Sequence, residues 1–125
     1  MALAKELMGL GFSAAQASGA GGGYAAITGV GTVQGDAVAI NAGSVVVSGA
    51  DGTVGARLPA TSVGDEVWVF NNSASTLKVW PDVGAAISVA GTGLGTVNSA
   101  FSQLTYKATL YKRVTSTQWL AITSA

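Results

Sequence analysis

The chain has 125 residues, of which 6 are Lys or Arg and 6 are Asp or Glu, so its formal net charge is zero. Only 10% of the residues are charged, 49% are hydrophobic, 18 are Gly, and His and Cys are absent. A neutral chain lacks the basic surplus that binding to a nucleic-acid backbone requires. Without imidazole and thiol groups, the usual zinc sites, disulfides and His- or Cys-based catalysis are excluded. These properties favour a structural or binding module over an enzyme.

The first expected element is a short helix at the start of the chain. Leu3, Leu7 and Leu10 recur at helical spacing and form an apolar stripe. A helix this short is marginal in water, so the stripe must dock on the chain's own core or on a neighbouring molecule. We therefore predict a helical docking arm over residues 1–17. Its candidate partner-binding residues are Leu3, Leu7, Met8, Leu10 and Phe12.

The same stretch resembles a secretory signal peptide only superficially. Glu6 follows Lys5 directly, and Gly9 and Gly11 interrupt a short apolar stretch, whereas a signal peptide has a longer unbroken one. No apolar run reaches the roughly 20 residues that a membrane-spanning helix needs. We therefore expect neither a cleaved leader nor a membrane partner.

A glycine-rich segment follows the arm. Residues 19–23 are Gly-Ala-Gly-Gly-Gly, which is the composition of a flexible tether. We assign residues 18–31 to this tether, which would let the arm reach beyond the chain's own core.

From residue 32 onward, short apolar runs alternate with clusters of Gly, Asn, Asp and Pro that are typical of turns. About eight short strands at roughly ten-residue spacing favour an all-β fold over residues 32–125. An antiparallel β-sandwich, a jelly roll and a barrel all fit this pattern. The expected strands are Ala37–Ile40, Ser44–Val47, Gly55–Leu58, Glu66–Asn71, Leu77–Trp80, Ala86–Val89, Leu104–Val114 and Trp119–Thr123.

Two of these strands carry the most information. In the strand over residues 104–114, apolar positions from Leu104 to Leu110 alternate with Thr and Lys positions, which predicts one buried face. In the strand over residues 66–71, the run Val-Trp-Val-Phe is apolar on both faces. That strand lies either at the centre of the core or under another subunit.

The aromatic residues on strands have three possible roles. Trp68, Phe70, Trp80, Tyr111 and Trp119 are candidates for a subunit interface. Core packing is the commoner role of aromatic residues on strands, and a platform for stacking on sugar, formed by the three Trp residues with Tyr106 and Tyr111, is a further alternative.

The charged and glycine-rich motifs predict no catalytic, cofactor or metal site. Asp65 and Glu66 are adjacent, so on a strand their carboxylates point to opposite faces and not across a cleft. A surface calcium site at a turn aspartate stays open. The basic cluster of Lys107, Lys112 and Arg113 is expected on a solvated face, with binding to an acidic partner surface as the alternative. The Gly-x-Gly fragments at residues 29–31 and 91–95 lack the strand–helix context of a phosphate loop and are interpreted as turns.

Several segments together resemble small structural proteins of tailed-bacteriophage particles. The arm from Leu3 to Ser13 looks like N-terminal segments of such proteins. The β-region is similar to a pattern in phage capsid and tail modules. The segments that carry this likeness are Ala56–Ala60, Gly64–Asp65, Val69–Asn71, Leu77–Pro81, Gly84–Ile87 and Thr117–Leu120.

The resemblance implies a capsid decoration (cement) protein, made in the host bacterial cytoplasm and carried on the outside of the virion. Such a protein typically forms homotrimers and clamps neighbouring major-capsid subunits, and it needs no cofactor and no nucleic acid. The alternative is a receptor- or glycan-binding module associated with the tail or its fibres. A small hydrolase using Asp65 or Glu66 is a third, weaker interpretation, because His and Cys are absent.

Overall fold

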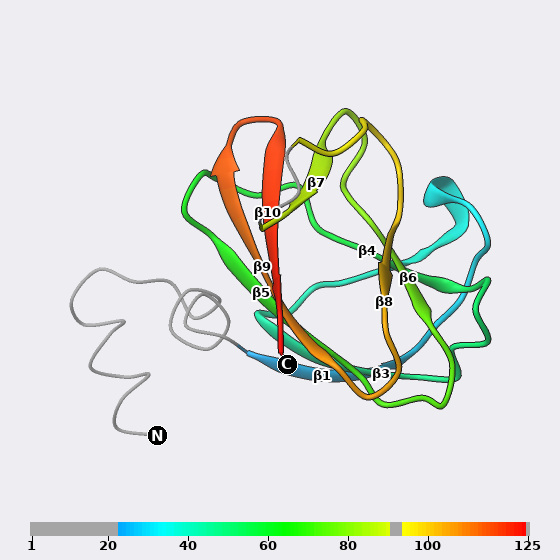
Figure 1. Cartoon of the computed structure of the whole chain (residues 1–125). Coiled ribbons are helices and arrows are strands. Elements are labelled where there is room, and N and C mark those ends of the chain that lie inside the picture. The colour runs from blue at the N-terminus through cyan, green and yellow to red at the C-terminus, as the bar shows by residue number, and fades with distance from the viewer. Residues whose placement is uncertain (1–22, 91–93, 125) are drawn as a thin grey trace, which may run out of the picture.

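Two facing β-sheets make up the part of the chain that the computed structural model describes, residues 23–90 and 94–124 (Figure 1). The predicted arm, with Leu3, Leu7, Met8, Leu10 and Phe12, lies outside the described residues. The large sheet contains, in spatial order, β1 (Tyr24–Thr28), β3 (Ser44–Ser48), β5 (Glu66–Asn71), β9 (Ala108–Thr115), β10 (Gln118–Thr123) and β7 (Ala86–Val89). The small sheet contains β2 (Val38–Ala39), β4 (Gly55–Arg57), β6 (Leu77–Trp80) and β8 (Phe101–Gln103).

The first six strands alternate between the two sheets along the chain. β1, β3 and β5 pair in parallel in the large sheet, and β2, β4 and β6 pair in parallel in the small sheet. Tyr24 therefore lies beside Ser44, and Ser44 lies beside Trp68. Each odd strand and the even strand after it form one turn of a flattened coil, and three such turns stack on one another as in a short solenoid.

The rest of the chain closes the last turn of this coil with antiparallel pairs. β9 pairs with β5 and β8 pairs with β6, both antiparallel. β10 returns beside β9 as a hairpin, and β7 lies parallel to β10 at the far edge of the large sheet. The last turn of the coil, β5 with β6, therefore has a further strand beside it in each sheet.

The hydrophobic core lies between the sheets, on the inner face of each strand. The alternation is clearest in β5, where Val67 and Val69 are buried and Trp68 and Phe70 point outward. The core residues are Ile40, Val45, Val47, Ala56, Leu58, Val67, Val69, Leu77, Val79, Ala85, Ile87, Tyr111, Trp119 and Ala121. The period of two in the sequence thus sets which residues are buried.

A buried polar network lies within this core. The Tyr111 hydroxyl donates to Gln103 Oε1 at 2.8 Å, and the Gln103 amide donates to the carbonyls of Val69 and Lys107, each at 2.8 Å. The Asn71 amide donates to the Gln103 carbonyl at 3.2 Å. Because burial disfavours the phenolate, the pKa of Tyr111 is raised well above its ordinary value of 10.0. The network joins β8 to β5 and β9.

The all-β fold is confirmed for the described residues, in which the only helical element is the short 3-10 turn η2 (Gln34–Asp36). The expectation of antiparallel pairing throughout is wrong, because both sheets are mixed. The prediction of a tether over residues 18–31 is also wrong in part, since residues 24–28 form strand β1. The turn chemistry marks where strands end, whereas long-range pairing decides their direction.

The predicted buried face of the strand near residue 110 is inverted. The structure begins this strand at Ala108 and buries Thr109, Tyr111 and Arg113, whereas Leu110 lies on the opposite face. Polar residues can lie inside here because they find partners, as in the 3.0 Å contact between the hydroxyls of Thr109 and Thr123.

Candidate interaction surface

The face of the large sheet that points away from the small sheet is unusually apolar, and we call it the outer face. Trp68 is 49% exposed and Phe70 is 36% exposed, although both lie on β5 in the middle of the sheet. In the strand register Trp68 lies between Ser44 and Leu110, and Phe70 lies between Val46 and Ala108. Tyr24, Ala26, Leu120 and Ile122 lie farther out on the same face. Large exposed apolar surfaces mark sites of association.

The register of the strands makes this apolar surface continuous. Trp68 lies beside Leu110 of β9, and Leu110 lies beside Ile122 of β10. In the next row, Val46 of β3 lies beside Phe70. Cross-strand neighbours on one face are about 5 Å apart, so these side chains form one surface across four strands.

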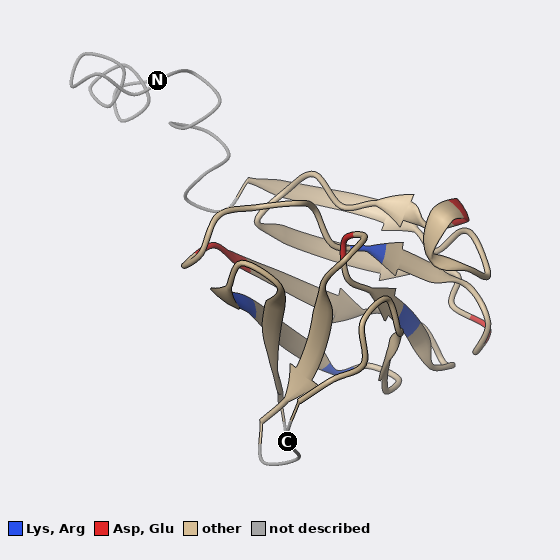
Figure 2. Cartoon of the chain, turned by 90° about the horizontal axis from the view of Figure 1, so that it is seen from above, with Lys and Arg blue, Asp and Glu red and all other residues tan. Residues whose placement is uncertain are grey.

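On the described strands of the large sheet, the charged side chains of the outer face are those of Glu66 and Lys112, which pair with each other. Figure 2 shows how few segments of the ribbon carry a charged residue. Glu66 and Lys112, neighbours on β5 and β9, form an ion pair with 3.5 Å between Lys112 Nζ and Glu66 Oε2, and each side chain is 46% exposed. An exposed pair of this kind adds little stability, but it leaves the outer face without net charge.

Three of the predicted interface aromatics lie elsewhere. Trp119 and Tyr111 are fully buried and Trp80 is only 7% exposed, so all three are packed in the chain's own core. They therefore cannot contact a second subunit or stack on a sugar in the folded chain. Trp68 and Phe70 are the two members of that predicted set that lie on the surface.

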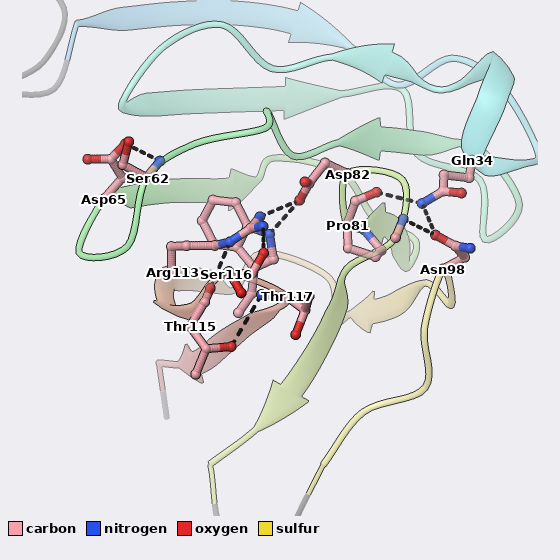
Figure 3. Close-up of polar contacts among 12 residues, drawn as sticks. Gln34, Ser62, Asp65, Pro81, Asp82, Asn98, Arg113, Thr115, Ser116 and Thr117 are labelled. Carbon is pink, nitrogen blue, oxygen red and sulfur yellow. Dashed lines mark hydrogen bonds and ion pairs between the residues drawn. The ribbon is translucent and has the colours of Figure 1, made fainter.

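Arg113 also differs from its expectation as part of a solvated basic face. Its guanidinium lies 2.6 Å from Asp82 Oδ1, and Trp119 Nε1 donates to the same oxygen at 2.9 Å (Figure 3). Arg113 Nε donates to the Thr115 carbonyl at 3.0 Å, and a second guanidinium nitrogen donates to the Ser116 carbonyl. The guanidinium carbon lies 5.2 Å from the centre of the Trp119 ring. This cluster locks the loop after β6 to the β9–β10 hairpin.

The remaining acidic and glycine motifs have structural roles. Asp51 accepts hydrogen bonds from the hydroxyl and the amide of Thr53 and from the amide of Val54, and these bonds lower the pKa of the Asp51 carboxyl. At Gly31, φ is +91° and a Cβ would lie 2.2 Å from the Asp36 carbonyl oxygen, so the turn requires glycine. Residues 23–90 and 94–124 contain no group of three or more His, Cys, Asp or Glu that could hold a metal ion.

Sequence reasoning identified Trp68 and Phe70 but missed the surface around them. Which face of the sheet an apolar residue occupies depends on which strands pair, and the local sequence does not encode the pairing. This applies to Val46, Leu110, Leu120 and Ile122. The run Val-Trp-Val-Phe is the signal that pointed to this surface.

The comparisons with known proteins give no relative on which to base a function. No family model, no curated protein and no solved structure matches the chain. In the described residues, no helix is long and apolar enough to cross a membrane.

Proposed function

We propose that this chain is an adhesive structural protein of a tailed-phage virion, a capsid decoration protein that binds the outside of the head and bridges major-capsid subunits. The observation that supports this proposal is the outer face, where Trp68 and Phe70 are exposed in the middle of a six-stranded sheet. Strands at the centre of a sheet bury one face on the core; the other face is ordinarily polar. Here it is apolar and neutral, which suits attachment to another protein.

The strength expected of this contact follows from the area that remains exposed. A Trp side chain buries up to about 250 Å², and Trp68 is 49% exposed, so roughly 100 Å² can still be buried on binding. At about 25 cal/mol per Å² this contributes about 2.5 kcal/mol before ordering costs are subtracted. A single subunit would bind weakly, and repetition over the capsid lattice would supply avidity. The apolar stripe predicted in residues 1–17 would add to the same contact.

The alternative, a glycan-binding module of the tail, finds less support. Of the five aromatic residues considered for stacking on sugar, Trp80, Tyr111 and Trp119 are buried, whereas Trp68 and Tyr106 are exposed. Trp68 is the one exposed tryptophan of the three in the chain. A change in indole fluorescence on adding oligosaccharides would therefore have to come from Trp68, and such a change would favour the alternative.

The proposal is tested by binding to undecorated heads of the parent phage. The double variant Trp68→Ser, Phe70→Ser should sediment with the heads at least about tenfold less than the unchanged chain, since about 1.4 kcal/mol corresponds to a factor of ten. Leu104→Ser removes an apolar side chain that is 57% exposed in the turn after β8 and should bind normally. Equal binding by the double variant and the unchanged chain would remove the outer face from the proposal.

A further inference from the structure

Strand β1 forms one edge of the large sheet. In the part of the chain that the structure describes, β1 pairs with β3 on one side and with no strand on the other. Its sequence, Tyr-Ala-Ala-Ile-Thr, contains no charged residue and no Pro, and its register with β3 is regular. Natural edge strands are normally protected from pairing by such features or by a covering segment.

The backbone of β1 presents a regular row of donors and acceptors to this open side. The Gly23 carbonyl accepts from Ser44 N at 3.0 Å, and Gly29 N donates to the Ser48 carbonyl at 2.8 Å. In a parallel ladder the amide and carbonyl of one residue point to the same side, and successive residues alternate. Residues 23, 25, 27 and 29 therefore face β3, so the amides and carbonyls of Tyr24, Ala26 and Thr28 face outward.

The opposite edge of the same sheet is covered. Next to β7, Gly95 N donates to Ser88 Oγ at 2.9 Å, and Val97 forms an isolated antiparallel bridge with Ala86. A Cβ on Gly95 would lie 1.9 Å from the Ile87 carbonyl oxygen, so the segment lies directly against β7. The Asn98 side chain accepts from Gly84 N at 2.8 Å and from Gln34 Nε2 at 3.1 Å, which fixes this cover in place (Figure 3). Among residues 23–90 and 94–124, the large sheet is thus covered at β7 and open at β1.

We propose that β1 pairs with β1 of a second copy of this chain, antiparallel about a two-fold axis at Ala26. Three hydrogen-bonded residue pairs then form, Tyr24 with Thr28 of the copy, Ala26 with its counterpart, and Thr28 with Tyr24 of the copy. The side chains match in size, because large Tyr24 meets small Thr28 and Ala26 meets Ala26. No charge lies on β1 or β3, so these strands cause no like-charge repulsion between the two copies. This inference does not depend on the proposed function.

The geometry favours two-fold over three-fold association at this edge. Two identical strands related by a two-fold axis are antiparallel and use the same edge on both copies. A ring of three through the large sheet would require β1 of one copy to pair with the β7 edge of the next, and residues 94–98 cover that edge. The homotrimer implied by the phage resemblance would have to form through another surface.

Single cysteines test the register, because the natural chain contains none. Residues opposite each other in a hydrogen-bonded antiparallel pair have Cα atoms about 5.5 Å apart, within the range of a disulfide. Full-length Ala26→Cys should therefore form a disulfide-linked dimer under mild oxidation. Thr28→Cys is the matched control on the same exposed face of β1, since its counterpart lies roughly 14 Å away at about 3.4 Å per residue. Ala26→Cys should yield at least about tenfold more cross-linked dimer than this control.

The oligomeric state of the full chain provides the second measurement. Sedimentation over a range of concentrations should show a dimer for the natural sequence. Ala26→Pro, which removes an outward-facing amide and leaves the pairing with β3 intact, should be monomeric at every concentration and keep the circular-dichroism spectrum of the natural chain. Its thermal midpoint should match that of the natural chain only at concentrations where the natural dimer has dissociated. Asn72→Lys, an exposed change off β1, should remain dimeric. A natural chain that is monomeric at every concentration, or equal cross-linking of the two cysteine variants, would overturn the proposal.

Discussion

Replacing Asp82 by Ala should destabilise the fold more than any comparable change at an exposed acidic residue. One oxygen of Asp82 holds both the guanidinium of Arg113 at 2.6 Å and the indole nitrogen of Trp119 at 2.9 Å. The side chains of Arg113 and Asp82 are only 6% and 14% exposed. Removal of the carboxylate therefore leaves a buried cation without its counter-ion and a buried indole N–H without an acceptor.

The expected magnitude follows from these two losses. Breaking a buried ion pair by removing one partner costs about 3–5 kcal/mol, and an orphaned buried N–H costs about 1–3 kcal/mol. Arg113 keeps its bonds to the carbonyls of Thr115 and Ser116, which offsets part of the first cost. We therefore expect Asp82→Ala to lower the free energy of unfolding by about 4 kcal/mol.

A double-mutant cycle separates the ion pair from the other contacts. Arg113→Met removes the charge and preserves much of the packing over the Trp119 ring. The double variant should be destabilised by about 2 kcal/mol less than the sum of the two single variants, because residues in contact couple by about 0.5–3 kcal/mol. Urea unfolding followed by circular dichroism and by tryptophan fluorescence provides the measurement, with slopes compared to confirm a two-state transition.

The exposed ion pair between Glu66 and Lys112 provides the control. Both side chains are 46% exposed, so Lys112→Ala should cost less than about 1 kcal/mol. If Asp82→Ala costs no more than Lys112→Ala, then the cluster does not lock the β6–β7 loop to the hairpin, and the structural role assigned to Arg113 is refuted.

Burial raises the pKa of Tyr111 in the folded chain, so this group leaves the stability unchanged below about pH 10 and lowers it as the pH rises further. Tyr111→Phe loses the hydrogen bond to Gln103 and should unfold more easily at neutral pH, but its thermal midpoint should fall less at alkaline pH. An alkaline fall equal to that of the natural chain would contradict this. Gly55→Ala places a Cβ 1.6 Å from the Lys78 carbonyl oxygen between paired strands and should cost about 3 kcal/mol or more in urea unfolding, whereas Gly35→Ala, with nothing within 4 Å, should be nearly neutral.

The positions of most strands were predictable because turn residues delimit them. The strand over residues 66–71 was predicted with the bounds that β5 has, since Gly64 and Asp65 precede it and Asn72 follows it. The strand β1 was missed because it directly follows the glycine run that ends at Gly23. The glycine run predicts a flexible segment, but it carries no information on the hydrogen bonds to β3 that make residues 24–28 a strand.

Strand direction and the fate of the polar residues were not predictable. Parallel pairing of β1, β3 and β5 joins residues about 20 positions apart, and no local signal encodes such a pairing. Arg113 was expected in solvent because cations are rarely buried; it is buried because Asp82 lies 31 residues away in sequence and 2.6 Å away in space. Trp119 is buried for the same reason, since Asp82 satisfies its indole N–H.

The two surfaces on which the proposals depend belong to one sheet, and this gives the proposals a geometric connection. Pairing of β1 with its copy would extend the large sheet across the two-fold axis and bring two outer faces to the same side of the dimer. Trp68 and Phe70 of both copies would then face one target together. Because a second contact made by a linked module is effectively intramolecular, a dimer would bind a repetitive shell far more tightly than a single chain. At concentrations where the reduced chain is monomeric, the disulfide-linked dimer of Ala26→Cys should therefore bind phage heads more tightly than the same variant kept reduced, and equal binding by the two forms would separate the two surfaces.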